Sequence, residues 1–356
     1  MLILAINPGS TSTKIGIFRE SDGDATEIFS ETLRHAAEEL AQYKDINSQL
    51  DFRRRTVLAA VEKAGLEIED ISGFVGRGGL VRSIESGVYR VNDRLLEDAR
   101  SGLQGVHASN LGSILAHSLA APLGKEAFIS DPVVVDELWD VARVTGHPEI
   151  KRRSIFHALN HKAIARKFCR ENDKIYEDSN LIVAHMGGGI SVGVHKKGRV
   201  VDVNNALDGD GPLSPERCGA LPTKELIDLC FSGKYDHTEI SAMIVPKGGF
   251  VAYFGINDLR LIEEKAQTDE KVKLVMDAMC YGIAKEIGAV AAAVAGDVDA
   301  ILLTGGMAYS KYLVNYITER VKFIAPVHSY PGEDELWALA SGVFRVLKGV
   351  ELSKEY

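Results

Sequence analysis

The chain has 356 residues, of which 46% are hydrophobic and 26% charged, and its formal net charge at pH 7 is −9. This composition predicts a folded chain and not a disordered one, and the length predicts two domains with a cleft between them. The negative charge argues against a general binder of nucleic acid or anionic membranes, because such proteins gather cations to neutralise phosphates.

The first half of the chain predicts strands that alternate with helices. Apolar runs at residues 2–6 and 14–18 flank a turn-forming segment and predict a β-hairpin. The next elements expected are helices at 36–43 and 52–64, a strand at 73–76, helices at 93–99 and 109–120, and a strand at 127–130. Such alternation indicates an α/β domain.

The second half repeats this plan. A helix is expected to begin at Arg152-Arg153 and to carry His157 and His161. A second hairpin follows, with strands at 182–186 and 191–195 and a third strand at 199–203. The later elements expected are helices at 224–231, 258–266, 270–295 and 310–321, a strand at 300–304, and a last helix to about residue 347. The repeated hairpin is the most informative feature of this organisation.

Cysteine usage and the absence of targeting segments favour a cytoplasmic protein. The four cysteines are scattered without a CxxC pair, which fits neither a zinc site nor a disulfide framework. Residues 1–6 lack the regions of a signal peptide. The apolar stretch 287–295 is far shorter than the roughly 20 residues of a membrane helix. We therefore expect a cytoplasmic location.

Two glycine-containing loops are candidates for binding phosphate. The first loop, residues 7–13, carries Asn7, Ser10 and Ser12 and leads to Lys14, and the second loop is Gly187-Gly188-Gly189. Backbone amides and hydroxyls in such loops can surround an anion. The alternative is that any hairpin tip is polar and rich in glycine, but Thr304-Gly305-Gly306 adds a third glycine turn and favours function. None matches the Walker or Rossmann pattern.

Arg77 and Arg217 both lie in turns that contain glycine. A guanidinium can pair with a carboxylate or phosphate through two hydrogen bonds and keeps its charge. The alternative for each is a surface ion pair, but functional residues concentrate in such turns.

Four histidines and one aspartate complete the candidate set. His157 and His161 are one helical turn apart, a spacing that suits two metal ligands, but no HExxH glutamate lies between them, which favours phosphate or structural contacts. His107 precedes a helix that Ser109 could cap. His185 precedes the second loop. Asp131 follows a strand and precedes Pro132, so it is either a Mg²⁺ ligand or a turn former.

Seven segments, in one order along the chain, resemble the acetate and butyrate kinases of the actin, hexokinase and Hsp70 superfamily. They are residues 6–14 (INPGSTSTK), 75–79 (VGRGG), 107–112 (HASNLG), 156–161 (FHALNH), 185–189 (HMGGG), 214–219 (SPERCG) and 303–306 (LTGG). The glycines at 76–79 and 187–189, with residues 131–138 and 204–212, depart from the acetate kinases and resemble the butyrate kinase branch.

This resemblance implies a fold of duplicated ribonuclease H-like domains of the actin-like ATPase type. Each domain would have a mixed five-stranded sheet flanked by helices, and the active site would lie in the interdomain cleft. Residues 1–150 and the C-terminal helix, about 333–356, would form the acyl-substrate and phosphate side. Residues 151–332 would bind the nucleotide. A homo-oligomer, either a dimer or an assembly of dimers, is also implied.

The implied reaction is a reversible, Mg²⁺-dependent phosphoryl transfer between ATP and a short-chain carboxylate such as butyrate or a branched acid, giving an acyl phosphate and ADP. By similarity, Arg77 would orient the carboxylate, and Arg217 and His157 would stabilise the transferring group. Asp131 and the pair Asp334-Glu335 would hold Mg²⁺, and Asn7 would position the phosphate or the metal. Gly305 and Gly306 would lie against adenosine, with His107, His161 and His185 as supporting contacts.

Two alternatives remain at this point. An acetate or propionate kinase would differ only in the acyl pocket, which the phosphate-side motifs do not resolve. A relative that transfers carbamoyl groups to tRNA would use His157 and His161 as a metal site.

Overall fold

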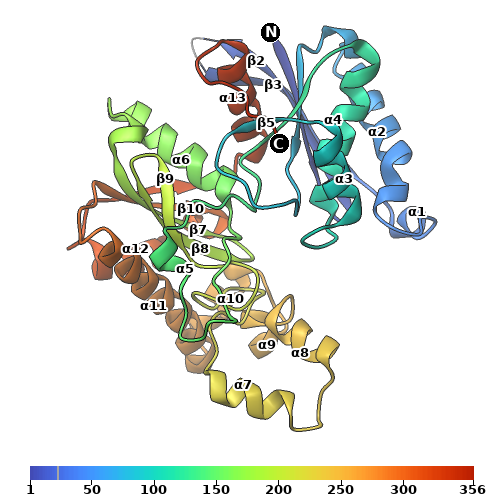
Figure 1. The fold of residues 1–356 in the computed structure, drawn as a ribbon. Coiled ribbons are helices and arrows are strands. Elements are labelled where there is room, and N and C mark those ends of the chain that lie inside the picture. Colours follow the sequence, from blue (N-terminus) through green and yellow to red (C-terminus); the bar gives the residue numbers. More distant parts are fainter. Residues whose placement is uncertain (22–23) are drawn as a thin grey trace. The chain divides into compact units, whose positions relative to one another are not determined.

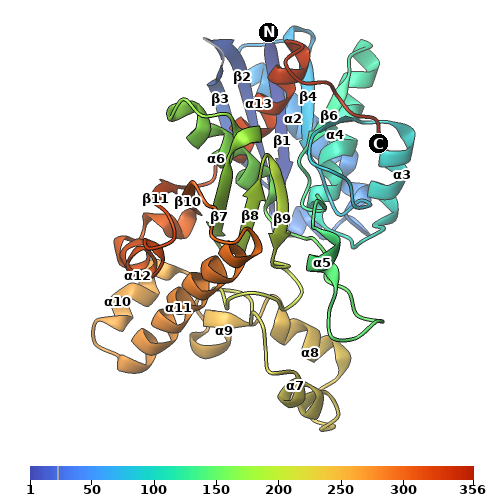
Figure 2. The ribbon, with the colours of Figure 1, turned by 60° about the vertical axis from the view of Figure 1, so that its left-hand side comes forward.

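The computed structural model describes residues 1–21 and 24–356, which form two compact units (Figures 1 and 2). Unit 1 comprises Met1–Val135, Ala158–Asn160 and Asp334–Tyr356, and unit 2 comprises Asp136–His157 and His161–Glu333. Residues 136–157, on either side of the boundary predicted near residue 150, thus group with unit 2. One reason is local: the Trp139 amide donates to the Val201 carbonyl, and Arg152 pairs with Asp202.

Unit 1 is built on a mixed sheet of six strands in the order β3-β2-β1-β4-β6-β5. The strands are β1 (Leu2–Pro8), β2 (Ser12–Ser21), β3 (Asp24–Arg34), β4 (Gly73–Arg77), β5 (Val88–Arg90) and β6 (Ala127–Ser130). β1 is central because its apolar residues are buried, and it pairs antiparallel with β2 and parallel with β4. The first loop therefore emerges where β1 ends beside the end of β4.

Helices cover both faces of this sheet. In Figures 1 and 2, α13 lies on one side of the strands and α2, α3 and α4 lie on the other. Leu4 and Ile6 of β1 pack in one apolar cluster with Val57 of α2 and Leu115 of α4. The helices of unit 1 are α1 (Ala37–Leu40), α2 (Leu50–Lys63), α3 (Asp93–Ser101), α4 (Leu111–Ala120) and α13 (Glu335–Leu347), and α6 begins at Ala158.

Unit 2 has a mixed sheet of five strands in the order β11-β10-β7-β8-β9. The strands are β7 (Asn180–Met186), β8 (Ile190–Lys196), β9 (Arg199–Val203), β10 (Ala300–Gly305) and β11 (Val327–Pro331). Alternate residues of β7 face opposite layers, as a strand requires. Leu181 and Val183 pack with α6, whereas Ile182 and Ala184 pack with the long helix α11.

The helices of unit 2 are mostly short apart from α11. They are α5 (Asp140–Arg143), α6 (Ala158–Glu171, shared with unit 1), α7 (Thr223–Cys230), α8 (His237–Ile244), α9 (Gly249–Phe254), α10 (Leu259–Ala266), α11 (Glu270–Ala293) and α12 (Lys311–Val321). α11 contacts β7, β8 and β9 and carries α10 and α12 on its sides. Among the described residues, no helix is both long and apolar enough to cross a membrane.

The two sheets share one topology, which confirms the predicted repeat. In each sheet, the first two strands form a hairpin and the third strand pairs antiparallel with the second. The first strand also pairs parallel with a later strand, and that later strand has a further parallel partner. Even the irregularity in the pairing of the second and third strands recurs, between Ile17 and Phe18 in unit 1 and between Val194 and His195 in unit 2. β5 is an antiparallel addition to the first sheet.

Some of the predicted elements were wrong. The helix expected to begin at Arg152 begins instead at Ala158, with His157 as its N-cap residue. Arg152 and Arg153 lie in the preceding irregular segment, where they bind Asp202 and Asp208. The first sheet has six strands and not five, because β5 pairs with β6. β3, β5, β11, α5, α8 and α9 were not predicted.

Two glycines let α4 approach β4 backbone to backbone. A Cβ on Gly76 would overlap the backbone of Gly112. We therefore expect Gly76→Ala to lower the free energy of unfolding by about 1–3 kcal/mol, the usual cost of overpacking, when measured by urea denaturation. Gly146→Ala is the control, since a Cβ there meets nothing within 4 Å. Equal stability of the two variants would contradict this close approach.

Candidate active site

The first loop has few side-chain contacts of its own at its tip. The Gly9 amide donates to the Ser12 carbonyl at 2.7 Å and closes the turn. Ser10 and Lys14 are exposed, and Ser12 and Asn7 are half-buried. These four predicted residues therefore lie on one hairpin.

A buried arginine that no sequence motif marks lies beneath this loop. Arg53, on α2, has no exposed surface. Its guanidinium donates to the carbonyl oxygens of Gly9, Ser10 and Ser12 at 2.9, 3.2 and 3.0 Å. It also donates to Thr13 Oγ1 at 3.0 Å and, through two nitrogens, to Gln49 Oε1. The shape of the loop thus depends on α2.

Asn7, Arg77 and Glu335 meet in unit 1, where β1 and β4 end and α13 begins. Asn7 Nδ2 donates to one carboxylate oxygen of Glu335, and Arg77 Nη1 donates to the other. The side chains of Arg77 and Glu335 are 19% and 17% exposed, so the pair is partly shielded from water. Glu335 thereby links Asn7 to Arg77, and all three are predicted site residues.

The structure separates the two acidic candidates at the start of α13. Asp334 is the N-cap of this helix, and its Oδ1 accepts from the Trp337 amide at 3.3 Å. Glu335 instead reaches Asn7 and Arg77. The helix cap accounts for Asp334 in structural terms, whereas Glu335 lies among the candidate site residues.

Asp131 is buried behind β6 and is held by a neighbouring turn. Its backbone has a φ of 38°, in the left-handed region. Its Oδ1 accepts from Ser86 Oγ at 2.6 Å and from the Gly87 amide at 2.9 Å. These contacts fit the turn-forming alternative, and the role of Asp131 as a metal ligand stays a prediction.

The segments around Arg77 and His107 pack against each other. A Cβ on Gly79 would overlap Asn110, whose Oδ1 accepts from the Leu80 amide at 2.8 Å. His107 is exposed, and its Nδ1 accepts from the Ser109 amide at 3.1 Å. The cap of this turn is therefore the His107 ring, and not Ser109 as expected.

The three glycines of the second loop each have a charged side chain packed on them. A Cβ on Gly187 would lie 3.0 Å from a carboxylate oxygen of Glu333, and one on Gly188 would lie 2.9 Å from a carboxylate oxygen of Glu216. A Cβ on Gly189 would overlap the guanidinium of Arg217. Only glycine at position 189 therefore leaves room for the Arg217 guanidinium to pack against the loop.

Arg217 is held in this position with part of its hydrogen-bonding capacity unused. Its Nη1 donates to the Ala206 carbonyl, and its Nε is buried without a hydrogen-bond partner in the described chain. Burial lowers the pKa of Arg217, but a guanidinium remains charged at neutral pH. A buried donor without a partner is unusual in a native protein and suits a site that receives an acceptor.

A chain of hydrogen bonds runs inward from His157. His157 Nδ1 and His161 Nε2 both lie 2.9 Å from Ser191 Oγ. His161 Nδ1 is 3.3 Å from His195 Nε2, and His195 Nδ1 is 2.8 Å from Tyr176 Oη. The sequence predicted a role for His157 but not for Ser191, His195 or Tyr176, whose positions depend on β8 and on the turn before β7.

The inner histidines of this chain are neutral at pH 7. Burial holds the pKa of His161 and of His195 well below the usual value for histidine. Each ring then has one donor nitrogen and one acceptor nitrogen. If Tyr176 donates to His195, then His195 donates to His161 and His161 donates to Ser191. The Ser191 hydroxyl in turn donates to His157 Nδ1. A neutral His157 then carries its proton on Nε2.

His185 covers His157 on one side. Their rings stack with centroids 3.9 Å apart and an interplanar angle of 17°. His185 Nε2 lies 3.2 Å from a carboxylate oxygen of Glu333, the residue that also packs on Gly187. His157, His185 and the second loop thus form one cluster in unit 2.

A pocket of about 680 Å³ opens beside the second loop and the Gly306 turn. Its wall consists of Gly187, Gly188, Pro215, Asn257, Asp258, Leu259, Arg260, Glu263, Gly306, Met307, Tyr309, Ser310 and Glu333. The predicted nucleotide residues Gly187, Gly188 and Gly306 therefore share one pocket. Gly305, with a φ of 90°, packs against the Met186 backbone.

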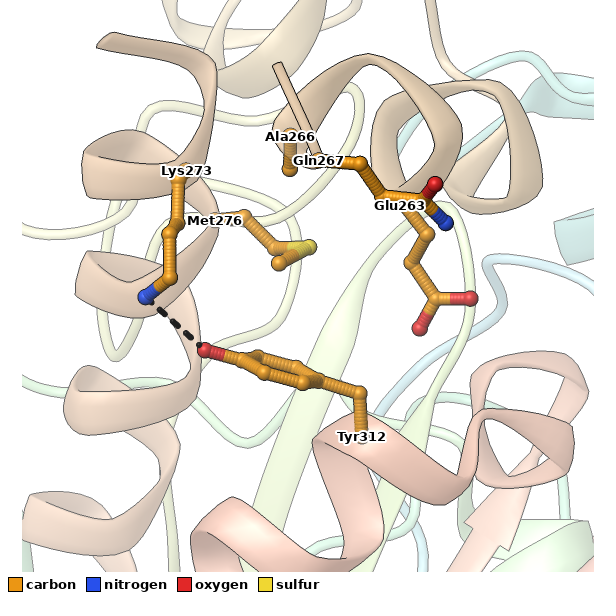
Figure 3. A pocket seen from close by; sticks show the side chains of 6 residues that line it. All are labelled: Glu263, Ala266, Gln267, Lys273, Met276 and Tyr312. Atoms are coloured by element: carbon orange, nitrogen blue, oxygen red, sulfur yellow. Dashed lines mark hydrogen bonds between the residues drawn. The ribbon is translucent and has the colours of Figure 1, made fainter. Parts of the chain in front are cut away.

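A smaller pocket of about 290 Å³ shares Glu263 with this one. It is lined by Glu263, Ala266, Gln267, Lys273, Met276 and Tyr312. Figure 3 shows the Tyr312 ring crossing its floor, with Lys273 Nζ 3.2 Å from the Tyr312 hydroxyl. The hydroxyl also donates to Asp277 at 2.5 Å.

Magnesium fits the oxygen donors near the first loop. Mg²⁺ is usually held by one or two carboxylates, phosphate oxygens and several waters. Glu335 offers a carboxylate and Asn7 an amide oxygen, and the two side chains are in contact. Over residues 1–21 and 24–356, no three His, Cys, Asp or Glu side chains gather into a group that could hold a metal by themselves.

Comparison with known proteins identifies the family. A sequence model of the acetokinase family matches residues 141–325. The chain is 52% identical over 355 residues to butyrate kinase 2 of Clostridium acetobutylicum and 53% identical to butyrate kinase 1 of the same organism, covering 99% of each chain in both cases. The chain belongs to the acetokinase family.

Membership of the acetokinase family confirms the resemblance drawn from the seven segments. Members of this family are kinases, phosphotransferases with a carboxyl group as acceptor, so this chain is an enzyme of that kind and uses ATP or ADP. The family assignment leaves the tRNA-directed carbamoyltransferase alternative without support.

Solved structures of two acetate kinases confirm the fold. An acetate kinase from Porphyromonas gingivalis matches with a TM-score of 0.81 at 19% identity, over 97% of this chain and 99% of that chain. An acetate kinase from Entamoeba histolytica matches with a TM-score of 0.77 at 17% identity, over 96% and 98%. The predicted α/β fold with two mixed sheets flanked by helices is therefore correct.

Proposed function

We propose that the chain is a butyrate kinase that transfers a phosphoryl group reversibly between ATP and a short-chain carboxylate. The observation that carries this proposal is the similarity to two butyrate kinases at 52% and 53% identity over essentially the whole of each chain. A probable butyrate kinase of Clostridium botulinum is 52% identical over the same length.

The chemistry requires no catalytic base. A carboxylic acid with a pKa of roughly 4 is already ionised at neutral pH, so its oxygen can attack the γ-phosphorus directly. The new O–P bond forms as the bond from phosphorus to the ADP oxygen breaks, and no proton is transferred. The barrier is the repulsion between two anions, which fixed positive groups and hydrogen-bond donors reduce.

Unit 1 would handle the carboxylate and the transferred phosphate. Arg77 would orient the carboxylate, and the first loop would bind phosphate through Ser10, Ser12 and backbone amides. Lys14 follows this loop in the sequence, and His107 belongs to the segment that packs against the Arg77 segment. Asn7 and Glu335 would hold Mg²⁺, which when bound lowers the charge of the phosphates. Of the two acids left open by the sequence, Glu335 is supported by its contacts with Asn7 and Arg77.

Unit 2 would hold the nucleotide. The pocket bounded by the second loop and Gly306 has room for a nucleoside, and Arg217 and His157 would stabilise charge on the phosphoryl group. The supporting geometry is the unused buried Nε of Arg217 and the anchoring of His157 through Ser191. A cytoplasmic location and a homo-oligomer, either a dimer or an assembly of dimers, complete the proposal, without nucleic acid or membrane as partner.

Measuring acyl-phosphate formation over straight and branched acids from acetate to valerate tests the substrate. We expect the highest kcat/KM at four carbons, with butyrate or isobutyrate. Because one methylene changes binding by only about 1–3 kcal/mol, neighbouring acids are expected to react more slowly and not to be excluded. A maximum at acetate would assign the chain to acetate phosphorylation instead.

A further inference from the structure

We propose that Arg53 is a positioning residue of the first loop, which it shapes for binding phosphate and to which it adds a positive charge. This inference rests on the proposed function in one respect, namely that the first loop binds a phosphoryl group. Arg53 lies beneath the loop and reaches the phosphate only through it.

The hydrogen bonds of Arg53 orient the loop backbone. In a planar trans peptide, the carbonyl and the following amide point in opposite directions. Because the carbonyls of Gly9 and Ser10 point toward Arg53, the amides of Ser10 and Thr11 point away from it. Neither amide has a hydrogen-bond partner among the residues that the structure describes. Two adjacent donors are thus presented for an anion, as in a phosphate-binding nest.

The charge of Arg53 is not balanced by an acidic side chain. All of its hydrogen bonds go to neutral oxygens, of Gly9, Ser10, Ser12, Thr13 and Gln49. No carboxylate of the described chain forms an ion pair with it. A fully buried cation without a counter-ion is costly unless something compensates it. An anion on the far side of the loop would supply that compensation.

Neighbouring groups leave this charge undiminished. His35 Nε2 lies 2.9 Å from Thr13 Oγ1, and burial, with the charge of Arg53 as the second cause, lowers the pKa of His35 to about 4. His35 is therefore neutral at pH 7. Burial lowers the pKa of Arg53 as well, but guanidinium stays protonated. One positive charge therefore remains beneath the loop.

The second loop is anchored differently, which sharpens the assignment. There the Gly188 carbonyl accepts from Ser214 Oγ at 2.7 Å and from the Glu216 amide at 3.2 Å, both neutral donors. The positive charge, Arg217, stands beside that loop on Gly189. In unit 1, a single arginine both anchors the loop and supplies charge, so its removal affects both properties at once.

The test uses Arg53→Met and Arg53→Lys in the full chain, assayed with butyryl phosphate plus ADP and with butyrate plus ATP. We expect Arg53→Met to lower kcat/KM for butyryl phosphate about 100-fold, a loss typical of removing a group that stabilises charge. The KM for butyrate should stay within about twofold. Arg53→Lys retains the charge but not the fork of hydrogen bonds, and we expect it to lose about 10-fold.

Arg55→Met is the matched control, because Arg55 is an exposed residue of the same helix and its loss changes the charge equally. We expect this variant to match the wild type. Where Arg53→Met does not fold, Arg53→Lys carries the test. An unchanged kcat/KM for butyryl phosphate in a folded Arg53 variant, with a lower Tm as the only effect, would show that Arg53 only stabilises the fold.

A direct probe separates this inference from the proposed function. Titrating the ¹⁵N-labelled wild-type protein with inorganic phosphate should shift the Ser10 and Thr11 amide resonances, and the same titration of Arg53→Lys should give weaker binding. Phosphate binding at the loop of a wild type that prefers another acid would overturn butyrate as substrate and leave the role of Arg53 intact. Wild-type amides that do not respond to phosphate would overturn the role of Arg53, whatever the substrate.

Discussion

Replacement of Arg217 by glutamine is expected to lower kcat about 1,000-fold and to leave the KM for ATP within a few-fold of the wild type. The guanidinium would act on charge that develops during transfer, and arginines in this role contribute 10³–10⁵ in kcat. Its buried Nε has no hydrogen-bond partner among the described residues, so one donor of the guanidinium is uncommitted. Initial-rate kinetics of acyl-phosphate formation measure both parameters.

Two further variants test the geometry around Arg217. Gly189→Ala leaves the arginine intact but puts a Cβ where the guanidinium lies, and we expect it to lower kcat about 100-fold. Arg320→Gln removes an exposed arginine of α12 in the same unit and should have no effect. A Gly189→Ala enzyme with full activity would mean that the observed contact of Arg217 with the loop is not the functional one.

Replacement of His157 by glutamine is expected to lower kcat 100-fold or more. An amide retains some hydrogen-bonding capacity but loses the imidazole, which stabilises the transferring group in the proposed mechanism. Ser191→Ala tests how His157 is held, because it removes the hydroxyl that bridges His157 and His161. We expect this variant to lose about 10-fold in kcat, with unchanged KM for ATP.

The reason is the orientation of the chain from Tyr176 to His157. Without the Ser191 hydroxyl, nothing in that chain selects the His157 tautomer that carries its proton on Nε2, and the tautomer populations visible in ¹⁵N spectra should change. His237→Gln, at an exposed histidine that begins α8, is the control. If Ser191→Ala has wild-type kinetics and an unchanged His157 spectrum, the inner residues serve folding alone.

The sequence was sufficient for the elements that have strong local patterns. Both hairpins, β6 and the long helix α11 were predicted because apolar runs, turn residues and helical periodicity agree there. β3 was missed because it is a sheet edge with mostly half-buried or exposed side chains, including Ile28 at 40% exposure, so its pattern is polar. β5 has only three residues and depends on its pairing with β6.

The candidate site residues could be predicted where they lie in loops with a recognisable sequence pattern. Arg77 and Arg217 were predicted because they lie in turns that contain glycine. Arg53 did not, because an arginine in a helix is ordinarily exposed and only the fold brings the first loop over it. Ser191 and His195 were likewise read as ordinary strand residues, since their partners His157 and His161 come from another element. The site residues themselves remain predictions that the proposed variants test.

Arg53 also makes the first loop and α2 one mechanical element, although about 40 residues separate them in the chain. Local opening of α2 would release the loop carbonyls, so loop and helix are expected to exchange amide hydrogens as one cooperative unit. A substitution on the buried face of α2, such as Val57→Ala, is then expected to loosen the first loop as well as the helix. If the first loop binds phosphate as proposed, stability and turnover in this enzyme would be coupled through a single side chain.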